Sequence, residues 1–208
     1  LSIRTFVSRL SDDVIRESIT QELRRGGQVY FVHNRVQSIE RIALRVRNLV
    51  PDARVIVAHG QMREKELEKI MLSFMAGEAD VLVCTTIIES GLDVPRANTM
   101  LIDRADMLGL AQLYQLRGRV GRSNQRAYCY LLIPEPSRLT GTAEKRVQVI
   151  QRLSELGSGF HVATMDMEIR GAGNLLGKKQ SGQVKEVGID LFCELLADAV
   201  SELKGSEE

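Results

Sequence analysis

Aromatic residues and unbalanced charge are both scarce in this sequence. There is no tryptophan, and phenylalanine and tyrosine together make up 4% of the 208 residues. Because the hydrophobic fraction is still 44%, which is ordinary for a globular protein, any core must be mainly aliphatic. The formal net charge is only +1, so a nucleic-acid contact would need a local basic patch rather than an overall positive field.

Cysteine is also rare, and its pattern argues against two classes of site. Cys84, Cys129 and Cys193 are far apart and form no Cys-x-x-Cys pair. We therefore expect neither a disulfide framework nor a zinc site, and we assign no metal ligands within the chain. Thiols spaced in this way suit a reducing cytosol best.

Signal peptides and membrane spans are missing from the pattern as well. No apolar run approaches the length of about 18 residues that a membrane helix needs. We therefore expect a soluble, cytoplasmic protein with no membrane contact. The sequence starts at Leu1 in the middle of a strand-like pattern, and we interpret it as a part of something larger.

The most one-sidedly basic part of the chain is residues 114–122, which lie in a stretch without any Asp or Glu, residues 107–134. Arginine is always charged and its planar fork of donors suits phosphate oxygens, while glycine lets a ligand come close. A solvated basic helix end is the simpler interpretation, and neighbouring motifs must decide between the two. The residues concerned are Gln115, Arg117, Gly118, Arg119, Gly121 and Arg122.

Residues 1–138 alternate between strand-like and helix-like patterns. Apolar runs of strand length are separated by amphipathic helices of 10 to 15 residues, which is typical of a parallel sheet covered on both faces. We therefore predict an α/β fold with a mostly parallel sheet. The expected strands are 3–7, 29–32, 55–58, 81–84, 99–102 and 127–133, and the expected helices are 11–25, 38–50, 63–75 and one that holds 112–116.

Polar residues follow four of the predicted strands. In open parallel sheets, ligands bind beyond the carboxyl ends of the strands. Loops after strands are usually polar, but the residue types here favour an edge that handles phosphates. These residues are His33-Asn34-Arg35, His59-Gly60, Thr85-Thr86 and Asp103-Arg104.

The segment 81–95 carries a second signal. Thr85 and Thr86 end a buried strand, and hydroxyls with backbone amides at such a place hold a phosphate without needing a charge. Gly91 permits a tight backbone, and Asp93 suits the hydroxyls of a ribose. The competing interpretation is an ordinary Asx turn before Pro95.

Taken together, these segments resemble the superfamily 2 helicases in the order and spacing of their motifs. Residues 81–93 are similar to motif V, residues 115–122 to motif VI, and residues 29–35 with His59-Gly60 to motifs IV and IVa. The resemblance implies the second RecA-like lobe of a two-lobe, ATP-driven motor.

The same resemblance implies roles for individual residues. Arg119 and Arg122 would be arginine fingers that reach ATP held by the other lobe, and Gln115 would also face the nucleotide. Gly91 and Asp93 would lie near its γ-phosphate and ribose. The residues expected along the DNA backbone are Arg35, His59, Gly60, Thr85 and Thr86.

The sequence lacks two motifs that a complete motor needs. It holds no Gly-x-x-x-x-Gly-Lys-Ser/Thr, and the nearest string, residues 173–179, has the wrong spacing. No Asp-Glu-x-His pair for magnesium appears either. ATP and Mg²⁺ are therefore expected to be held mainly by a first RecA-like lobe, and this chain alone is expected to be inactive.

Residues 139–203 change in character. Helices are expected at 142–156 and from about 161 to 169, followed by a glycine-rich turn and Gln180-Ser181-Gly182. A plain packing appendage is one interpretation. The segment also resembles the TRG (translocation in RecG) hairpin and hook, which implies that Arg170 and Gln180 couple ATP hydrolysis to movement, with Arg152 as a partner. Residues 204–208 are a polar tail.

Residues 187–200 are similar to the transcription-repair coupling factor family and unlike RecG. The resemblance implies a translocase on double-stranded DNA that displaces stalled RNA polymerase and works with excision-repair proteins. Two alternatives stay open. One is a RecG-type lobe that remodels forks, and the other is a module without motor activity that binds DNA or protein.

Overall fold

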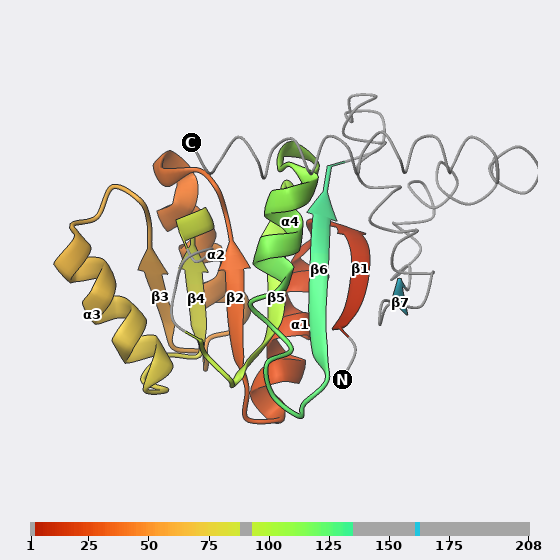
Figure 1. Cartoon of the computed structure of the whole chain (residues 1–208), viewed down its shortest axis with the longest axis horizontal. Coiled ribbons are helices and arrows are strands. Elements are labelled where there is room, and N and C mark those ends of the chain that lie inside the picture. Colours follow the sequence, from red (N-terminus) through yellow and green to blue (C-terminus); the bar gives the residue numbers. More distant parts are fainter. Residues whose placement is uncertain (1–2, 88–92, 135–160, 163–208) are drawn as a thin grey trace, which may run out of the picture.

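The computed structural model describes residues 3–87, 93–134 and 161–162. Its centre is a sheet with the strand order β3-β4-β2-β5-β6-β1-β7 (Figure 1). Every neighbouring pair of these strands is parallel. The strands are β1 Ile3–Arg9, β2 Gln28–Val32, β3 Val55–Ala58, β4 Val81–Cys84, β5 Ala97–Asp103, β6 Ala127–Ile133 and β7 His161–Val162.

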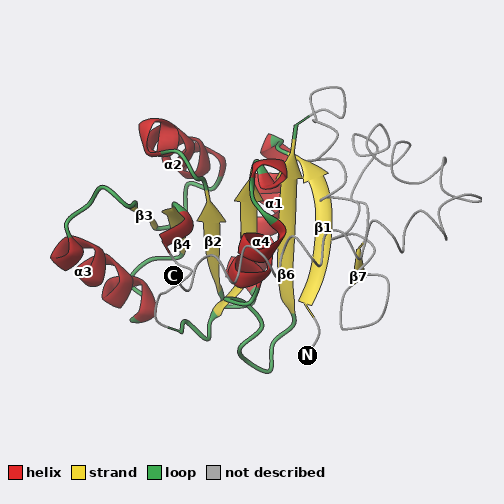
Figure 2. Cartoon of the chain, turned by 45° about the horizontal axis from the view of Figure 1, so that its top comes forward, coloured by secondary structure: helices red, strands yellow, loops and turns green. Residues whose placement is uncertain are grey.

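Helices cover both faces of this sheet (Figures 1 and 2). The apolar residues of α1 and α2 pack in one core cluster, and those of α3 and α4 pack in the other. The predicted α/β class with a covered parallel sheet is thus confirmed. The helices are α1 Asp12–Arg24, α2 Ile39–Leu49, α3 Glu64–Met75 and α4 Leu110–Arg117, with short 3-10 turns η1 Val36–Ser38 and η3 Ala105–Met107.

The central strands are buried because they are continuous apolar runs. All five residues of β2 and all four of β4 are buried, and the aromatic rings of Tyr30 and Phe74 lie with their centroids 5.4 Å apart. Fully buried strands need apolar side chains on both faces, which these sequences supply. The core therefore runs along the middle of the sheet.

Local signals set the ends of α1. The Ser11 hydroxyl accepts a hydrogen bond from the Val14 amide at 3.2 Å, and Asp12 and Asp13 stand in the first turn. Beyond the last turn, Gly26 takes a φ of +78°, a conformation that glycine adopts without strain. The sequence predicted both ends correctly.

The second helix begins differently from a capped helix. The structure places the 3-10 turn η1 before α2, and the Ser38 side chain makes no capping hydrogen bond. Its hydroxyl instead lies 2.6 Å from Nε2 of His33. The start of this helix is therefore tied to the end of β2.

The helix expected from about residue 161 is wrong at its first two residues. His161–Val162 is a short strand, β7, whose backbone pairs with Arg4 and Thr5 of β1. Without that pairing, the open side of β1 would have unpaired backbone groups. The rest of the predicted region 139–203, including its hairpin and hook, lies outside the described residues.

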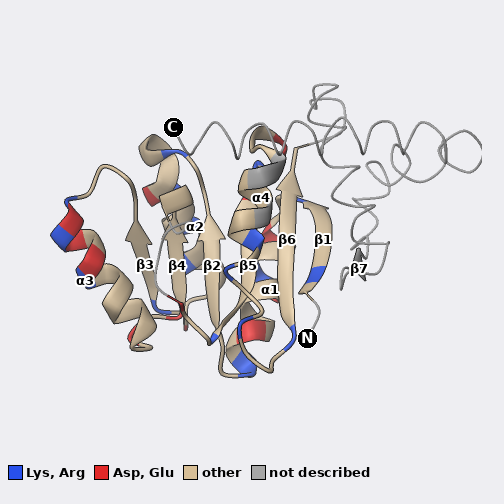
Figure 3. Cartoon of the chain, viewed as in Figure 1, with Lys and Arg blue, Asp and Glu red and all other residues tan. Residues whose placement is uncertain are grey.

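The charged residues of α3 face solvent. Residues 63–66 and 68–69, which alternate in sign, are all exposed, as expected for a solvated helix face (Figure 3). No helix among the described residues has the length and apolarity required to traverse a membrane.

Candidate functional sites

The predicted site residues fall into two groups that the fold holds apart. One group follows the strands β2, β3, β4 and β5, at the carboxyl ends of the sheet. The other group lies in segments that precede β5 and β6, and it includes Asp93 and Arg122. Since all strand pairs are parallel, residues after strands and residues before strands belong to opposite edges of the sheet. We call the first group the carboxyl edge and the second, with Gln115 and Arg119, the arginine cluster.

The arginine cluster is built on the end of α4 and the turn that follows. Leu116 and Val120 are buried and anchor this segment to the core. The Arg119 amide donates to the Leu116 carbonyl at 3.0 Å, which keeps the turn tight after the helix ends. Gln115 and Arg122 are exposed and Arg119 is half-buried, so the basic stretch offers donors at the surface (Figure 3).

Asp93 and Arg122 form an ion pair between two distant segments. Arg122 Nη1 lies 2.7 Å from Asp93 Oδ1, and Arg122 Nε donates to the Gly118 carbonyl at 2.9 Å. Both side chains are well exposed, at 43% and 58%. An exposed pair of this kind contributes only about 0–1 kcal/mol, so Arg122 can exchange Asp93 for a phosphate at little cost.

The charges of the arginine cluster act on the buried Tyr30 of β2. Burial is the main cause that raises the pKa of the Tyr30 hydroxyl; Asp93 adds to the rise, while Arg119 and Arg122 oppose it. The charges of all three residues therefore act at one place, although they come from segments almost 30 positions apart at the extremes. The structure thus brings the predicted residues Asp93 and Arg122 into contact, and Arg119 lies three positions before Arg122 on the same turn.

Gly121 has a structural task that the sequence did not reveal. Its φ is +78°, and a Cβ added there would lie 2.9 Å from Cγ1 of Ile3 and 3.5 Å from Cβ of Ala127. The glycine therefore lets the arginine-bearing turn pass close to β1 and β6. Close approach of a ligand is not needed to explain it.

Gly121→Ala should accordingly destabilise the protein through two effects. A positive φ costs a residue with a Cβ roughly 1–2 kcal/mol, and overpacking adds roughly 1–3 kcal/mol. Gly26→Ala is the matched control, because Gly26 has the same φ of +78° but nothing within 4 Å of an added Cβ. Urea denaturation should show the larger loss for Gly121→Ala, and equal losses would contradict the close contact with Ile3.

The carboxyl edge is held together by hydrogen bonds between strands. Thr86 Oγ1 donates to Asn34 Oδ1 at 3.3 Å, which joins the segments after β4 and β2. His33 Nδ1 lies 2.7 Å from Asp103 Oδ2, which joins the ends of β2 and β5. Of the four polar segments predicted to meet at this edge, the one after β2 therefore contacts both the one after β4 and the one at the end of β5.

The remaining predicted residues of this edge differ in their exposure. Asn34, Arg35 and Gly60 are exposed, while His59 is half-buried and its Nδ1 accepts from the Gln61 amide at 3.3 Å. A Cβ at Gly60 would meet only Ile87 Cγ2, at an ordinary 3.6 Å. The surface of the edge is thus formed by the loops after β2 and β3.

Thr85 is placed differently from Thr86. Thr85 is 5% exposed, and its hydroxyl has no hydrogen-bond partner among the described residues. Thr86 is half-buried and reaches the edge. Of the two hydroxyls, that of Thr86 is the one a backbone phosphate can meet without rearrangement of the strand end, and a role for Thr85 stays a prediction.

Four predicted residues lie outside the described residues. They are Gly91, Arg152, Arg170 and Gln180, and their roles stay predictions.

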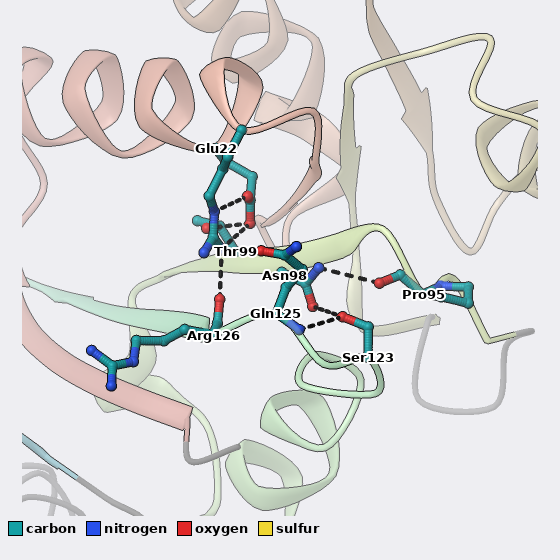
Figure 4. Close-up of polar contacts among 8 residues, drawn as sticks. Glu22, Pro95, Asn98, Thr99, Ser123, Gln125 and Arg126 are labelled. Atoms are coloured by element: carbon teal, nitrogen blue, oxygen red, sulfur yellow. Dashed lines mark hydrogen bonds and ion pairs between the residues drawn. The ribbon is translucent and has the colours of Figure 1, made fainter.

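Sequence reasoning missed a buried polar network at the amino edge (Figure 4). The Glu22 side chain is 1% exposed, accepts from Thr99 Oγ1 at 2.8 Å and pairs with Arg25. Arg25 in turn donates to the carbonyl of Arg126 at 2.6 Å. The helical spacing of Ile15, Ile19 and Glu22 was the available signal that Glu22 is buried, because it places the glutamate on the apolar face of the helix. It did not indicate which residues Glu22 contacts.

A second chain of contacts in the same view fixes the turn before β6. Asn98 Nδ2 donates to the Pro95 carbonyl at 3.2 Å, and Ser123 Oγ donates to Asn98 Oδ1 at 3.3 Å (Figure 4). The Gln125 amide donates to Ser123 Oγ at 3.2 Å. The loop that carries the arginine cluster is therefore braced against the start of β5.

Two of the three cysteines are packing residues. Burial raises the pKa of Cys129 to about 12, and it raises the pKa of Cys84 as well. A thiol with a raised pKa is a poor nucleophile at neutral pH. Within the described ranges no group of three His, Cys, Asp or Glu side chains is placed to hold a metal ion.

Comparison with known sequences gives one family match and a consistent set of relatives. The family described as "Helicase conserved C-terminal domain" matches residues 11–124. A transcription-repair-coupling factor of Myxococcus xanthus is 56% identical over 98% of this chain, and that of Escherichia coli strain K12 is 53% identical over 100% of it. The chain spans only 17% and 18% of the length of these two relatives.

Solved structures agree with the fold. RecG bound to a three-way DNA junction is similar with a TM-score of 0.63 and 30% identity, over 92% of this chain and 25% of that one. Domain 2 of the DEAD-box helicase Mss116p, bound to an RNA duplex, is similar with a TM-score of 0.57 and 16% identity, over 98% of this chain and 80% of that one. The second likeness concerns the fold alone, which is that of the RecA-like C-terminal lobes of helicases.

Proposed function

The chain belongs to the helicase conserved C-terminal domain family, and from that membership we propose that it is the second motor lobe of an ATP-dependent translocase on double-stranded DNA. We further propose that this motor displaces stalled RNA polymerase and thereby couples transcription to nucleotide excision repair in the bacterial cytoplasm. The partner lobe, which would hold the P-loop, would lie in the remaining length that the relatives have and this chain does not span.

One observation carries the choice of motor. The coupling factors match 98% to 100% of this chain at 53% to 57% identity, well beyond residues 11–124 of the family match. RecG, by comparison, is 30% identical over 92% of the chain. Matches of this overall identity that extend through the last third of the chain support the coupling-factor type of motor over the RecG type.

The arginine cluster fits one half of a nucleotide site. Arg119 and Arg122 would contact the phosphates of ATP, Gln115 would face the nucleotide, and Asp93, next to Gly91 in the sequence motif, would accept from the ribose. The exposed Asp93–Arg122 pair supports this assignment, because both groups are held at the surface by a weak contact that ligand groups can replace. When bound, ATP supplies the free energy of its hydrolysis, and the first lobe would hold it with Mg²⁺.

The carboxyl edge fits a phosphate backbone. Asn34 and Arg35 are exposed, Thr86 supplies a hydroxyl at the same edge, and Gly60 leaves room beside His59. Short polar side chains and backbone amides position a duplex without reading its sequence. This composition suits a motor that steps along any DNA.

The experiment that tests the proposal compares ATP turnover by this chain alone and by the chain joined to its P-loop lobe, with duplex DNA and Mg²⁺. Turnover is expected only from the joined protein. The substrate separates the two motor types: displacement of a stalled polymerase supports the coupling-factor type, and activity restricted to DNA forks supports the RecG type. DNA binding that is indifferent to ATP analogues would favour a module without motor activity.

A further inference from the structure

Three polar side chains form a continuous hydrogen-bonded series inside the carboxyl edge. His33 Nε2 lies 2.6 Å from Ser38 Oγ, and His33 Nδ1 lies 2.7 Å from Asp103 Oδ2. The side chains of His33 and Asp103 are only 9% and 7% exposed. We call this series the His33 relay. None of its members is among the residues proposed above to touch DNA or nucleotide.

The relay fixes the imidazole at both nitrogens. A carboxylate accepts only, so Nδ1 must donate its hydrogen to Asp103. Nε2 then accepts from the Ser38 hydroxyl when the ring is neutral. A buried carboxylate that loses its partner costs several kcal/mol, so the Asp103–His33 contact resists breaking. While both contacts hold, a displacement of Ser38 would act on Asp103 through the imidazole.

The Ser38 end of the relay belongs to the DNA-facing segment. Ser38 ends η1, which directly follows Asn34 and Arg35, and it immediately precedes α2. Asn34 also accepts from Thr86 across the edge. A phosphate that contacts residues 34–36 thus acts on a short segment whose far end is hydrogen-bonded to His33.

The Asp103 end belongs to the segment that carries the arginine cluster. Asp103 is the last residue of β5, and Arg104 follows with a φ of +51°. The Arg104 side chain donates to the buried carboxylate of Asp106 at 3.0 Å and 2.9 Å, which makes η3 stiff. The chain then enters α4, which leads to Arg119 and Arg122.

We propose that the His33 relay couples DNA contact at residues 34–36 to the placement of the arginine cluster, with His33 and Asp103 as positioning residues for DNA-stimulated ATP turnover. This inference rests on the proposed function. Coupling between distant sites travels through packed and hydrogen-bonded elements of this kind, and it typically changes an affinity by a factor of about 5 to 150.

The test uses the full-length protein, which would include the P-loop lobe as well as this chain. It measures the ratio of ATP turnover with duplex DNA to ATP turnover without it. His33→Gln places an amide near the Nε2 position and His33→Asn places one near the Nδ1 position, so each retains one end of the relay. Asp103→Asn removes the carboxylate at constant shape. All three variants should lower the DNA stimulation ratio by about tenfold and leave turnover without DNA unchanged.

Gln28→Leu is the matched control for lost stability. Gln28 begins the same strand, β2, and its buried amide donates to the carbonyls of Phe74 and Ala79 at 2.7 Å and 2.8 Å. This substitution should lower the melting temperature as the relay variants do, but leave the DNA stimulation ratio intact. A ratio that falls equally in Gln28→Leu would show that the relay residues act through stability alone and would overturn the inference.

A binding measurement supplies a readout that a purely structural role would not move. Because coupling free energies are reciprocal, a non-hydrolysable ATP analogue should change the affinity for a DNA duplex in the wild type, and that change should shrink in His33→Gln. If the relay variants kept both the stimulation ratio and the analogue effect of the wild type, the inference would be overturned and the proposed function would stand. A wild-type protein with no DNA stimulation at all would overturn the proposed function, and the inference with it.

The series Asp, His, Ser also occurs in the triads of serine hydrolases. A fluorophosphonate probe separates that chemistry from a positioning role, because it labels activated serine hydroxyls. No labelling of Ser38 is expected. Labelling that depends on His33 and Asp103 would mean that Ser38 is a nucleophile, and the positioning role would fall.

Discussion

Replacing Arg119 by alanine in the full-length protein is expected to lower DNA-stimulated ATP turnover by roughly 10³- to 10⁵-fold, the range that an arginine finger contributes to phosphoryl transfer. Arg119 lies in the turn after α4, and that turn is anchored by the buried residues Leu116 and Val120. Its backbone is therefore held in place by packing that the substitution leaves intact, and the loss should come from the guanidinium.

The loss should appear in kcat and not in nucleotide affinity, because the first lobe would supply most of the ground-state contacts. Arg122→Ala should act in the same direction, since Arg122 also reaches the surface of the arginine cluster. Arg126→Ala is the control, because it removes an exposed charge from the same basic stretch. Normal turnover in Arg119→Ala would rule out its role as a finger.

Replacing Arg170 or Gln180 should abolish movement along DNA while ATP turnover continues. The resemblance to the TRG element implies that these residues couple hydrolysis to stepping, and Arg152 is expected to join them. The measurement pairs ATP turnover with displacement of a triplex-forming strand from duplex DNA. Turnover near the wild-type rate with no displacement is the expected result. Loss of both activities, or of neither, would count against a coupling role.

The two predictions separate chemistry from movement. Replacing Arg119 should stop ATP hydrolysis and, with it, strand displacement. Replacing Arg170 or Gln180 should stop displacement alone. If all three substitutions gave the same phenotype, the division into an arginine cluster and a coupling hook would have no functional basis.

Much of the fold was predictable because most strands are continuous apolar runs in the sequence. The strands 55–58, 81–84 and 127–133 were predicted with their observed bounds, and Ser11 caps α1 as expected. Three strands proved longer than predicted, among them β2, which begins at Gln28. β1 continues through Ser8 and Arg9, which pair with Leu132 and Ile133, and β5 begins at Ala97. Polar residues at strand ends give no apolar signal, although their backbone still pairs.

The candidate sites were predictable as residue types but not as an arrangement. The rule for parallel sheets correctly gathered His33, Thr86 and Asp103 at one edge. It could not indicate that Asp93 and Arg122 meet elsewhere, because that contact depends on how two loops cross in space. The contact of the buried Glu22 with Thr99 is equally invisible in one sequence, since the two residues lie 77 positions apart.

Gly121 has a structural reason that the sequence did not indicate. The sequence suggested that its lack of a side chain admits a phosphate. The structure shows a positive φ and the side chain of Ile3 in the space that a Cβ would need. Glycine at such a place serves the fold.

We propose that this chain supplies one half of an ATPase site and does not turn over ATP by itself. The most direct measurement is steady-state ATP hydrolysis, with duplex DNA and Mg²⁺, by the isolated chain and by the same chain covalently joined to its P-loop lobe. We predict no turnover above background for the isolated chain and DNA-stimulated turnover for the joined protein. Turnover by the isolated chain that disappears with a metal chelator would contradict the account, because it would require a complete nucleotide site within these 208 residues.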